Sequence, residues 1–168
     1  MGIIKAIILI LTTNIIFVSC GIYSFTGASI SPDVKTVTIN YFDNRALNVQ
    51  PTLSQTLTEA LKDRFNSQTN LDQINKNGDL IFEGYISGYR VSPVAIQGNQ
   101  TAALNRLTIK INVKFTNNKD HSQDFDTSFS EYEDYESSKS IDSVEDELIK
   151  QIVDKLTEDI FNKLVANW

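Results

Sequence analysis

Alternation between apolar and polar residues is clearest over residues 106–116, where it predicts a half-buried β-strand. Every odd-numbered position in this stretch is apolar, and every even-numbered position is polar. The apolar positions are Leu107, Ile109, Ile111, Val113 and Phe115. Because successive side chains of a strand point to opposite faces, one face should be buried while the other meets solvent. This pattern is typical of an antiparallel sheet with one uncovered face.

Three further strands are predicted, over residues 34–42, 80–91 and 123–133. The first is rich in β-branched residues, and the other two carry bulky apolar side chains at even steps. Phe125 and Phe129 should share the apolar face of the preceding strand, whose inward residues are also odd-numbered. The numbers of two residues that lie opposite each other in these two strands must then add up to an even number. We therefore expect a connecting loop with an odd number of residues, such as residues 118–120, or a bulge.

Two amphipathic helices are predicted around these strands. The first is expected over residues 51–67, where Pro51 suits the first turn and apolar residues recur at spacings of three and four. The second begins near Ser143 and carries an apolar residue at every fourth position from Val144 to Leu164. A coiled coil would need alternating steps of three and four, so packing against the sheet is the favoured interpretation.

The predicted order of elements is β-α-β-β-β-α, which defines an α+β fold. The crossover through the first helix makes the first two strands parallel, and the last three strands form an antiparallel meander. Each helix has one apolar stripe, so both helices should cover the same face of the sheet. We therefore expect a two-layer sandwich, with two helices on one face of a four-stranded mixed sheet, and a single domain over residues 34–168.

Residues 1–19 fit the pattern of a lipoprotein signal peptide. Lys5 precedes an apolar run over residues 6–18, which is shorter than the roughly 20 apolar residues that a membrane-spanning helix needs. The small Ser19 stands directly before Cys20, the only cysteine, which predicts cleavage between them and a lipid on the thiol. Residues 20–33 would then be a lipid-anchored tether. The alternatives are an uncleaved anchor and a buried core cysteine.

Composition narrows the classes of function. The formal net charge of −6 becomes −7 when Lys5 is removed with the signal peptide, so general nucleic-acid binding is not expected. A single cysteine excludes an intramolecular disulfide, and the one histidine, His121, falls in a predicted turn. These residues offer neither the ligand set of a zinc site nor a base beside a nucleophile. We expect no enzymatic activity, no metal site and no cofactor.

The strongest candidate for a binding surface is a basic and aromatic stripe on the uncovered face of the sheet. Its residues are Arg106, Lys110, Lys114, Tyr85 and Tyr89. The three basic residues lie at steps of four along one strand, which places them on one face, roughly 13 Å apart. Such a stripe could bind a phosphorylated lipid or the acidic wall of a partner. The alternative is an ordinary solvated face, neutralised by cross-strand carboxylates such as Glu131.

Several stretches of the chain resemble LptE-type lipopolysaccharide-assembly lipoproteins. They are residues 20–27, which begin Cys-Gly-Ile-Tyr, and residues 51–63, 92–98, 102–108 and 143–168. The resemblance rests on these stretches taken together. The resemblance extends over nearly all of the chain after Ser19.

The resemblance implies an outer-membrane lipoprotein that plugs the LptD β-barrel, supports assembly of the barrel and assists lipopolysaccharide transport. The family fold of two helices on a four-stranded sheet agrees with the predicted fold. Cys20 is the one residue to which the resemblance assigns a family role, that of the lipid anchor. The absence of an aspartate directly after Cys20 favours the outer membrane, facing the periplasm. Two alternatives are a periplasm-facing lipoprotein that scaffolds another envelope complex and an enzyme on a lipid tether.

Overall fold

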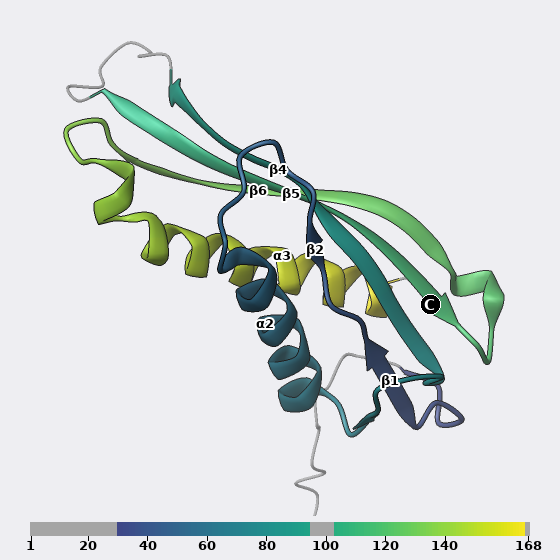
Figure 1. Ribbon diagram of the computed structural model, residues 1–168. Coiled ribbons are helices and arrows are strands. Elements are labelled where there is room, and N and C mark those ends of the chain that lie inside the picture. The colour runs from purple at the N-terminus through teal and green to yellow at the C-terminus, as the bar shows by residue number, and fades with distance from the viewer. Residues whose placement is uncertain (1–29, 95–102, 167–168) are drawn as a thin grey trace, which may run out of the picture.

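Two helices lie against one face of a six-stranded mixed sheet in the computed structural model, which describes residues 30–94 and 103–166 (Figure 1). The strands are β1 (Thr36–Ile39), β2 (Asp43–Asn44), β3 (Asp72–Gln73), β4 (Leu80–Val94), β5 (Leu104–Asn117) and β6 (Phe125–Glu136). The helices are α2 (Leu53–Gln68) and α3 (Glu145–Ala166), and short 3₁₀ turns span His121–Gln123 and Ile141–Ser143. The predicted α+β sandwich and its order of major elements are confirmed.

The sheet has the strand order β3-β1-β4-β5-β6, and β2 pairs separately with β4. β1 runs parallel to β4, while β4, β5 and β6 form an antiparallel meander, as predicted. The prediction of four strands was wrong by two, because β2 and β3 are each only two residues long. The expected strand over 34–42 ends at Ile39, and the chain pairs again with β4 at Asp43.

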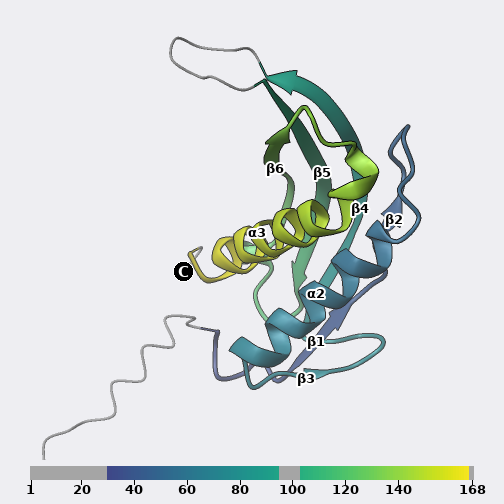
Figure 2. The same ribbon diagram turned by 90° about the vertical axis from the view of Figure 1, so that its left-hand side faces the viewer.

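The core forms between the helices and the inner face of the sheet. Figures 1 and 2 show α2 and α3 on the same side of the long strands. All five odd-numbered apolar residues of β5 are buried, as the alternation predicts. The α2 stripe of Leu53, Leu57, Leu61 and Phe65 is fully buried against them. Burial of one apolar stripe per helix is the main stabilising term for amphipathic helices, because tertiary packing contributes more to their stability than intrinsic helix propensity does.

A bulge in β4 changes which side chains reach the uncovered face. Pairing with β5 shifts between Ile86 and Gly88, so one residue of β4 is left over. Before the bulge, Tyr85 lies opposite Asn112 on the uncovered face; after it, Tyr89 lies opposite the buried Ile109. The prediction that Tyr85 and Tyr89 share the uncovered face was therefore wrong.

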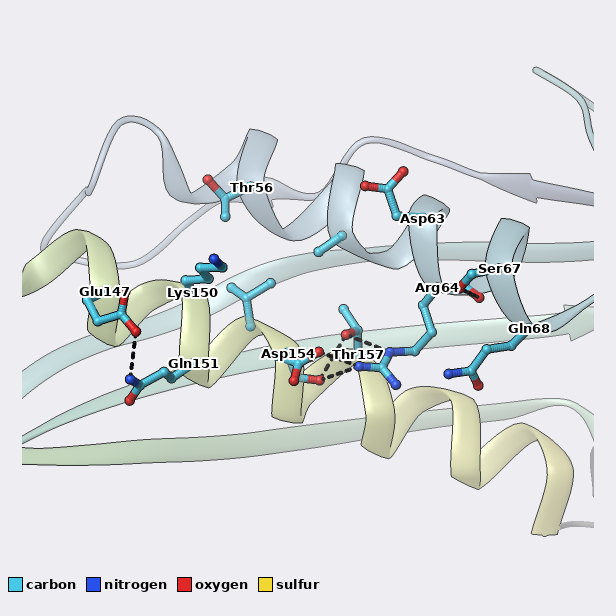
Figure 3. A pocket seen from close by; sticks show the side chains of 12 residues that line it. Thr56, Asp63, Arg64, Ser67, Gln68, Glu147, Lys150, Gln151, Asp154 and Thr157 are labelled. Carbon is cyan, nitrogen blue, oxygen red and sulfur yellow. Dashed lines mark hydrogen bonds and ion pairs between the residues drawn. The ribbon is translucent and has the colours of Figure 1, made fainter.

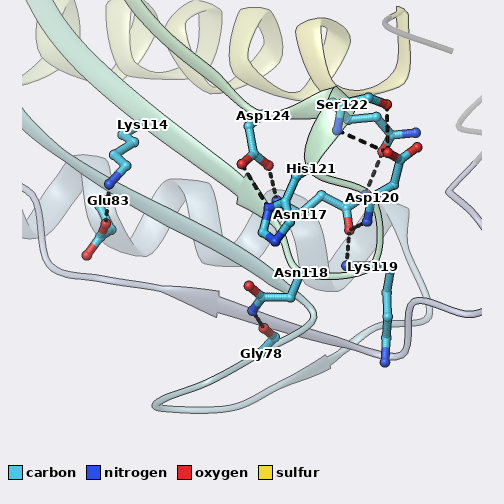
Figure 4. Close-up of polar contacts among 11 residues, drawn as sticks. Gly78, Glu83, Lys114, Asn117, Asn118, Lys119, Asp120, His121, Ser122 and Asp124 are labelled. Atoms are coloured by element: carbon cyan, nitrogen blue, oxygen red, sulfur yellow. Dashed lines mark hydrogen bonds and ion pairs between the residues drawn. The ribbon is translucent and has the colours of Figure 1, made fainter.

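The β5–β6 connection confirms the predicted parity of the pairing. Phe115 lies opposite Phe125, an even sum, and the seven residues 118–124 separate the two strands. The loop is longer than the three residues suggested by the sequence because Asn117 organises it (Figure 4). Asn117 Nδ2 donates to Gln123 Oε1 at 2.6 Å, and Asn117 Oδ1 accepts from the backbone N–H of Lys119 at 2.9 Å.

Asp79 ties three segments together at the start of β4. Its carboxylate accepts hydrogen bonds from the backbone N–H groups of Lys35 and Thr36, at 2.8 and 3.0 Å. Nζ of Lys119, in the β5–β6 loop, lies 3.0 Å from Oδ1 of Asp79, and the side chain of Asp79 is only 19% exposed. The backbone donor of Lys35, followed by the ammonium group of Lys119, holds the pKa of Asp79 well below its usual value of 3.8.

We expect Asp79→Asn to lower the free energy of unfolding by about 2 kcal/mol at pH 7, because hydrogen bonds to a charged acceptor are lost. A carboxylate with a depressed pKa stabilises the folded state above its unfolded-state pKa, and that contribution is lost as pH falls through the folded-state value. The difference between variant and wild type should therefore shrink between pH 7 and pH 3. Urea denaturation at both pH values measures it.

Asp72→Asn is the matched control, because Asp72 carries the same charge on neighbouring β3 but is exposed. It should change the free energy of unfolding by less than about 0.5 kcal/mol. An equal effect of the two variants, or a pH-independent effect of Asp79→Asn, would contradict the role given to the Asp79 carboxylate.

Candidate binding face of the sheet

Arg106 is the most firmly held residue of the predicted stripe. It lies on the uncovered face of β5, directly opposite Asp134 of β6. Its Nε and Nη2 donate to the two carboxylate oxygens of Asp134 at 2.7 and 2.9 Å, and its guanidinium lies 3.6 Å from the centre of the Tyr132 ring. The bidentate bond from Arg106 lowers the pKa of Asp134. This geometry fixes a planar cation beside an exposed aromatic ring.

Lys110 and Lys114 also lie on the uncovered face, as predicted, but their surroundings differ. Lys114 Nζ is 3.8 Å from Glu83 Oε2 on β4 (Figure 4), a weak and exposed pair. Lys110 is exposed and lies opposite Gly88 and Ser130, neither of which carries a charge. Within the described residues, Lys110 takes part in no ion pair. It is therefore the cation of the stripe most readily offered to an external anion.

Tyr85 is joined on the uncovered face by a residue outside the predicted stripe. The guanidinium carbon of Arg45 lies 4.4 Å from the centre of the Tyr85 ring. Arg45 follows β2 directly, and its backbone N–H donates to the carbonyl of Ile86 at 2.9 Å. The short β2 pairing thus places a second cation over a second tyrosine.

Tyr89 has a structural role on the inner face. Its hydroxyl donates to Glu145 Oε1 at the start of α3. Burial, and then the hydrogen bond to Glu145, raise the pKa of Tyr89 well above its usual value. The residue therefore joins the bulged half of β4 to the second helix, and it does not belong to the binding face.

Glu131, which the alternative interpretation named as a neutralising carboxylate, does not lie on the face of the stripe. Glu131 lies opposite Ile109 on the helix-facing side of the sheet, where burial and the nearby Asp159 raise its pKa. The carboxylates that neutralise the stripe are instead Asp134 and Glu83. What remains as the candidate face is Arg45, Tyr85, Arg106, Lys110, Lys114 and Tyr132, which we call the stripe face.

Sequence reasoning missed Arg45 and Tyr132 as members of this face. Tyr132 lies within an acidic run that indicates only a solvated strand end. Its even number, taken with the even-sum rule for the β5–β6 pair, would have placed it on the face of Arg106. No comparable signal exists for Arg45, since the two-residue β2 has no periodic pattern.

A groove of about 630 Å³ lies on the opposite side of the molecule, between α2 and α3 (Figure 3). Arg64 spans it: Nη2 lies 2.5 Å from Asp154 Oδ1, and Nε donates to Thr157 Oγ1 at 3.0 Å. Figure 3 shows this arginine reaching from one helix to the other, which indicates that it holds the helices together.

Cys20 lies outside the described residues. His121 is exposed in the β5–β6 loop, with Nδ1 3.1 Å from Asp124 Oδ2. Within residues 30–94 and 103–166, no group of three His, Cys, Asp or Glu side chains is placed to hold a metal ion. In the same ranges, no helix combines the length and the apolar character that crossing a membrane requires.

Several solved structures have a similar fold at low sequence identity. A minor lipoprotein from Acinetobacter baumannii matches with a TM-score of 0.54 and 13% identity, covering 80% of this chain and 95% of the other. A neuraminyllactose-binding hemagglutinin homologue from Helicobacter pylori gives a TM-score of 0.55 at 10% identity, with 84% and 89% covered. Lipoprotein B from Nitrosomonas europaea gives 0.51 at 10% identity, with 79% and 83% covered. These likenesses show a shared fold.

No curated protein matches the sequence. The sequence does match a family model described as LptE, lipopolysaccharide-assembly, over residues 34–164. The match begins just before β1, so it includes every strand, α2 and all of α3 except its last two residues. The chain therefore belongs to the LptE family of lipopolysaccharide-assembly proteins.

Proposed function

We propose that this protein is a lipoprotein, anchored to the outer membrane through Cys20 and facing the periplasm, that plugs an LptD-like β-barrel. In this role it supports assembly of the barrel and assists transport and insertion of lipopolysaccharide. The observation that carries the proposal is the family match over residues 34–164. Membership of a lipopolysaccharide-assembly family makes the barrel, the lipopolysaccharide and the membrane the partners to test first.

The architecture supports the proposal in two ways. A plug needs a stable body that fills space, and the two-layer sandwich provides one through a continuous core that joins both helices to the sheet. It also needs an outward surface for polar contacts, and the stripe face offers cations beside tyrosine rings. Guanidinium and ammonium groups bind phosphates such as those of lipopolysaccharide, or acidic groups of a barrel wall. This function requires no catalytic residue.

Affinity purification of the full protein tests the proposal. The protein, tagged at its C-terminus, is recovered from detergent-solubilised membranes, and co-purifying proteins are identified by mass spectrometry. A large β-barrel protein in stoichiometric amount, absent from an unrelated tagged lipoprotein, is the expected result. Recovery without a barrel would contradict the plug function. Recovery with another complex would support the scaffolding alternative.

Lys110 allows a sharper test of the stripe face. Lys110→Glu should weaken binding to immobilised lipopolysaccharide about three- to tenfold, because an exposed cation is replaced by an anion. No internal ion pair of the described residues is broken, so the melting temperature should stay unchanged. Biolayer interferometry on the purified protein measures the affinity.

Lys150→Glu is the matched control for this experiment. It changes the net charge by the same amount but lies exposed on α3, beside the interhelical groove. An equal loss of affinity in both variants would mean that overall charge, and not the stripe face, governs binding.

A further inference from the structure

β6 is a long strand at the end of the sheet. It has twelve residues and pairs on one side with β5 along its whole length. Within the described part of the chain, no strand pairs with its other side. The opposite end of the sheet is closed by the two-residue β3, so β6 presents by far the longer terminal strand (Figures 1 and 2).

The register shows which backbone groups point to this free edge. The backbone N–H of Ser137 donates to the carbonyl of Ala103 at 3.0 Å, so residues 103 and 137 form a hydrogen-bonded pair. The pairing is regular from Leu104↔Glu136 to Phe115↔Phe125. Hydrogen-bonded pairs alternate along an antiparallel ladder, so the odd-numbered residues of β6 bond to β5. The even-numbered residues therefore direct their N–H and C=O groups outward; they are Asp126, Ser128, Ser130, Tyr132, Asp134 and Glu136.

The edge is acidic on both faces of the sheet. β6 contains five carboxylates and no lysine or arginine. Asp134 and Glu133 are paired with Arg106 and Lys155. Asp126 and Glu136 lie on the uncovered side, and Glu131 lies on the helix side beside Asp159. A strand added to this edge would meet negative charge with both its upward and its downward side chains.

We propose that the outer edge of β6 binds an extended, lysine- or arginine-rich segment of a partner protein, which adds a further strand to the sheet. The outward backbone groups supply main-chain hydrogen bonds, and the carboxylates select a basic sequence. A second copy of this chain is a poor occupant, because pairing two β6 edges would place like charges opposite one another. Exposed Ser128 and Ser130 leave the middle of the edge open to an approaching backbone. This inference does not depend on the proposed barrel partner.

Hydrogen exchange by NMR tests the proposal on the full processed protein in detergent micelles. The probe is a ten-residue peptide that alternates lysine and valine, and its counterpart carries glutamate in place of lysine. The lysine peptide should slow exchange of the Ser128, Ser130 and Tyr132 amides, which point outward. The odd-numbered amides, already bonded to β5, should change little. The glutamate peptide should have no effect, and added salt should weaken binding of the lysine peptide.

Ser130→Pro removes one outward N–H while leaving the ladder to β5 intact, which edge strands tolerate. It should weaken peptide binding about tenfold relative to Ser130→Thr, which keeps the N–H. If the proline variant does not fold, a peptide with alternate N-methyl groups on the bonding edge makes the same test without changing the protein. Absence of binding, binding without slower exchange at the even-numbered amides, or an equal affinity of both variants would overturn the proposal. Slower exchange on raising the protein concentration alone would also overturn it, in favour of self-pairing.

Discussion

Phe65→Ala is expected to lower the free energy of unfolding by about 3–5 kcal/mol, which is the range for removing a fully buried phenylalanine ring. Phe65 is 0% exposed and lies on the inner stripe of α2. Its ring centre is 4.9 Å from that of Phe82 on β4 and 5.4 Å from that of Phe161 on α3. One side chain therefore touches both helices and the sheet, so its loss leaves a cavity at the junction of both layers.

The contacts of Phe65 are part of a longer series of rings. Phe82 packs on Phe115 at 4.8 Å, and Phe115 packs on Phe125 at 5.1 Å. The series crosses β4, β5 and β6, so backbone shifts that could fill the cavity would have to disturb three paired strands. Limited relaxation of this kind places a substitution at the costly end of its range.

Two controls separate cavity formation from a general loss of apolar surface. Phe65→Leu keeps most of the volume and should cost less than about 1.5 kcal/mol. Phe125→Ala deletes the same ring at a half-buried position and should cost clearly less than Phe65→Ala. Urea denaturation followed by circular dichroism gives all three values. Similar losses for Phe65→Ala and Phe125→Ala would show that Phe65 has no special position in the core.

Long elements with a regular spacing of apolar residues could be predicted from the sequence, because burial of one face imposes that spacing. The eleven residues 106–116 must alternate if one face of β5 is to be dry, and the structure buries each apolar position. The first helix is likewise displaced by only two residues at its start, from 51 to Leu53. The second begins at Glu145, two residues after Ser143.

Short elements and shifts of register could not be predicted in this way. A two-residue strand such as β2 is too short to show a periodic pattern, so the sequence could not predict that Arg45 lies over Tyr85. The bulge after Ile86 reverses the faces of the following residues without any change in composition, which moved Tyr89 to the core.

The length of the β5–β6 loop could not be predicted either, and it decides which residues of β6 lie opposite those of the stripe face. A three-residue loop at 118–120 would place Arg106 opposite Tyr132, whereas the seven-residue loop places it opposite Asp134. Both registers satisfy the even-sum rule. The rule alone therefore could not predict whether Arg106 lies opposite Tyr132, on whose ring it could stack, or opposite Asp134, with which it could form an ion pair. In the structure Arg106 makes both interactions: it donates to the carboxylate of Asp134, directly opposite, and lies over the neighbouring ring of Tyr132.

We expect Gly84→Ala to lower the free energy of unfolding by about 3 kcal/mol, although it adds a single methyl group. A Cβ at Gly84 would lie 2.5 Å from Cε1 of Phe42 and closer still to the carbonyl oxygen of Asn112. Phe42 is fully buried, and its backbone N–H donates to Thr58 Oγ1 at 3.1 Å. Neither a paired backbone carbonyl nor an anchored, buried ring can move aside cheaply.

Gly88→Ala provides the matched control, because Gly88 lies four residues further along the same strand. A Cβ at Gly88 would meet only the side chain of Lys110, at 3.3 Å, on the uncovered face. The 3.3 Å contact with Cβ of Lys110 needs a shift of only a few tenths of an ångström, and alanine avoids the backbone entropy cost that glycine carries within a strand. The free energy of unfolding of this variant should therefore stay within about 0.5 kcal/mol of wild type.

A double-mutant cycle with Phe42→Ala assigns the cause of the Gly84 effect. Phe42→Ala is destabilising by itself, but it removes the ring that a Cβ at Gly84 would strike. Gly84→Ala should therefore cost at least 1 kcal/mol less in the Phe42→Ala background than in wild type, since residues in contact couple by about 0.5–3 kcal/mol. An unchanged cost would assign the effect to the Asn112 carbonyl alone. A negligible cost in wild type would mean that β4 can separate from Phe42, and that the short β2 segment is held more loosely than its contacts indicate.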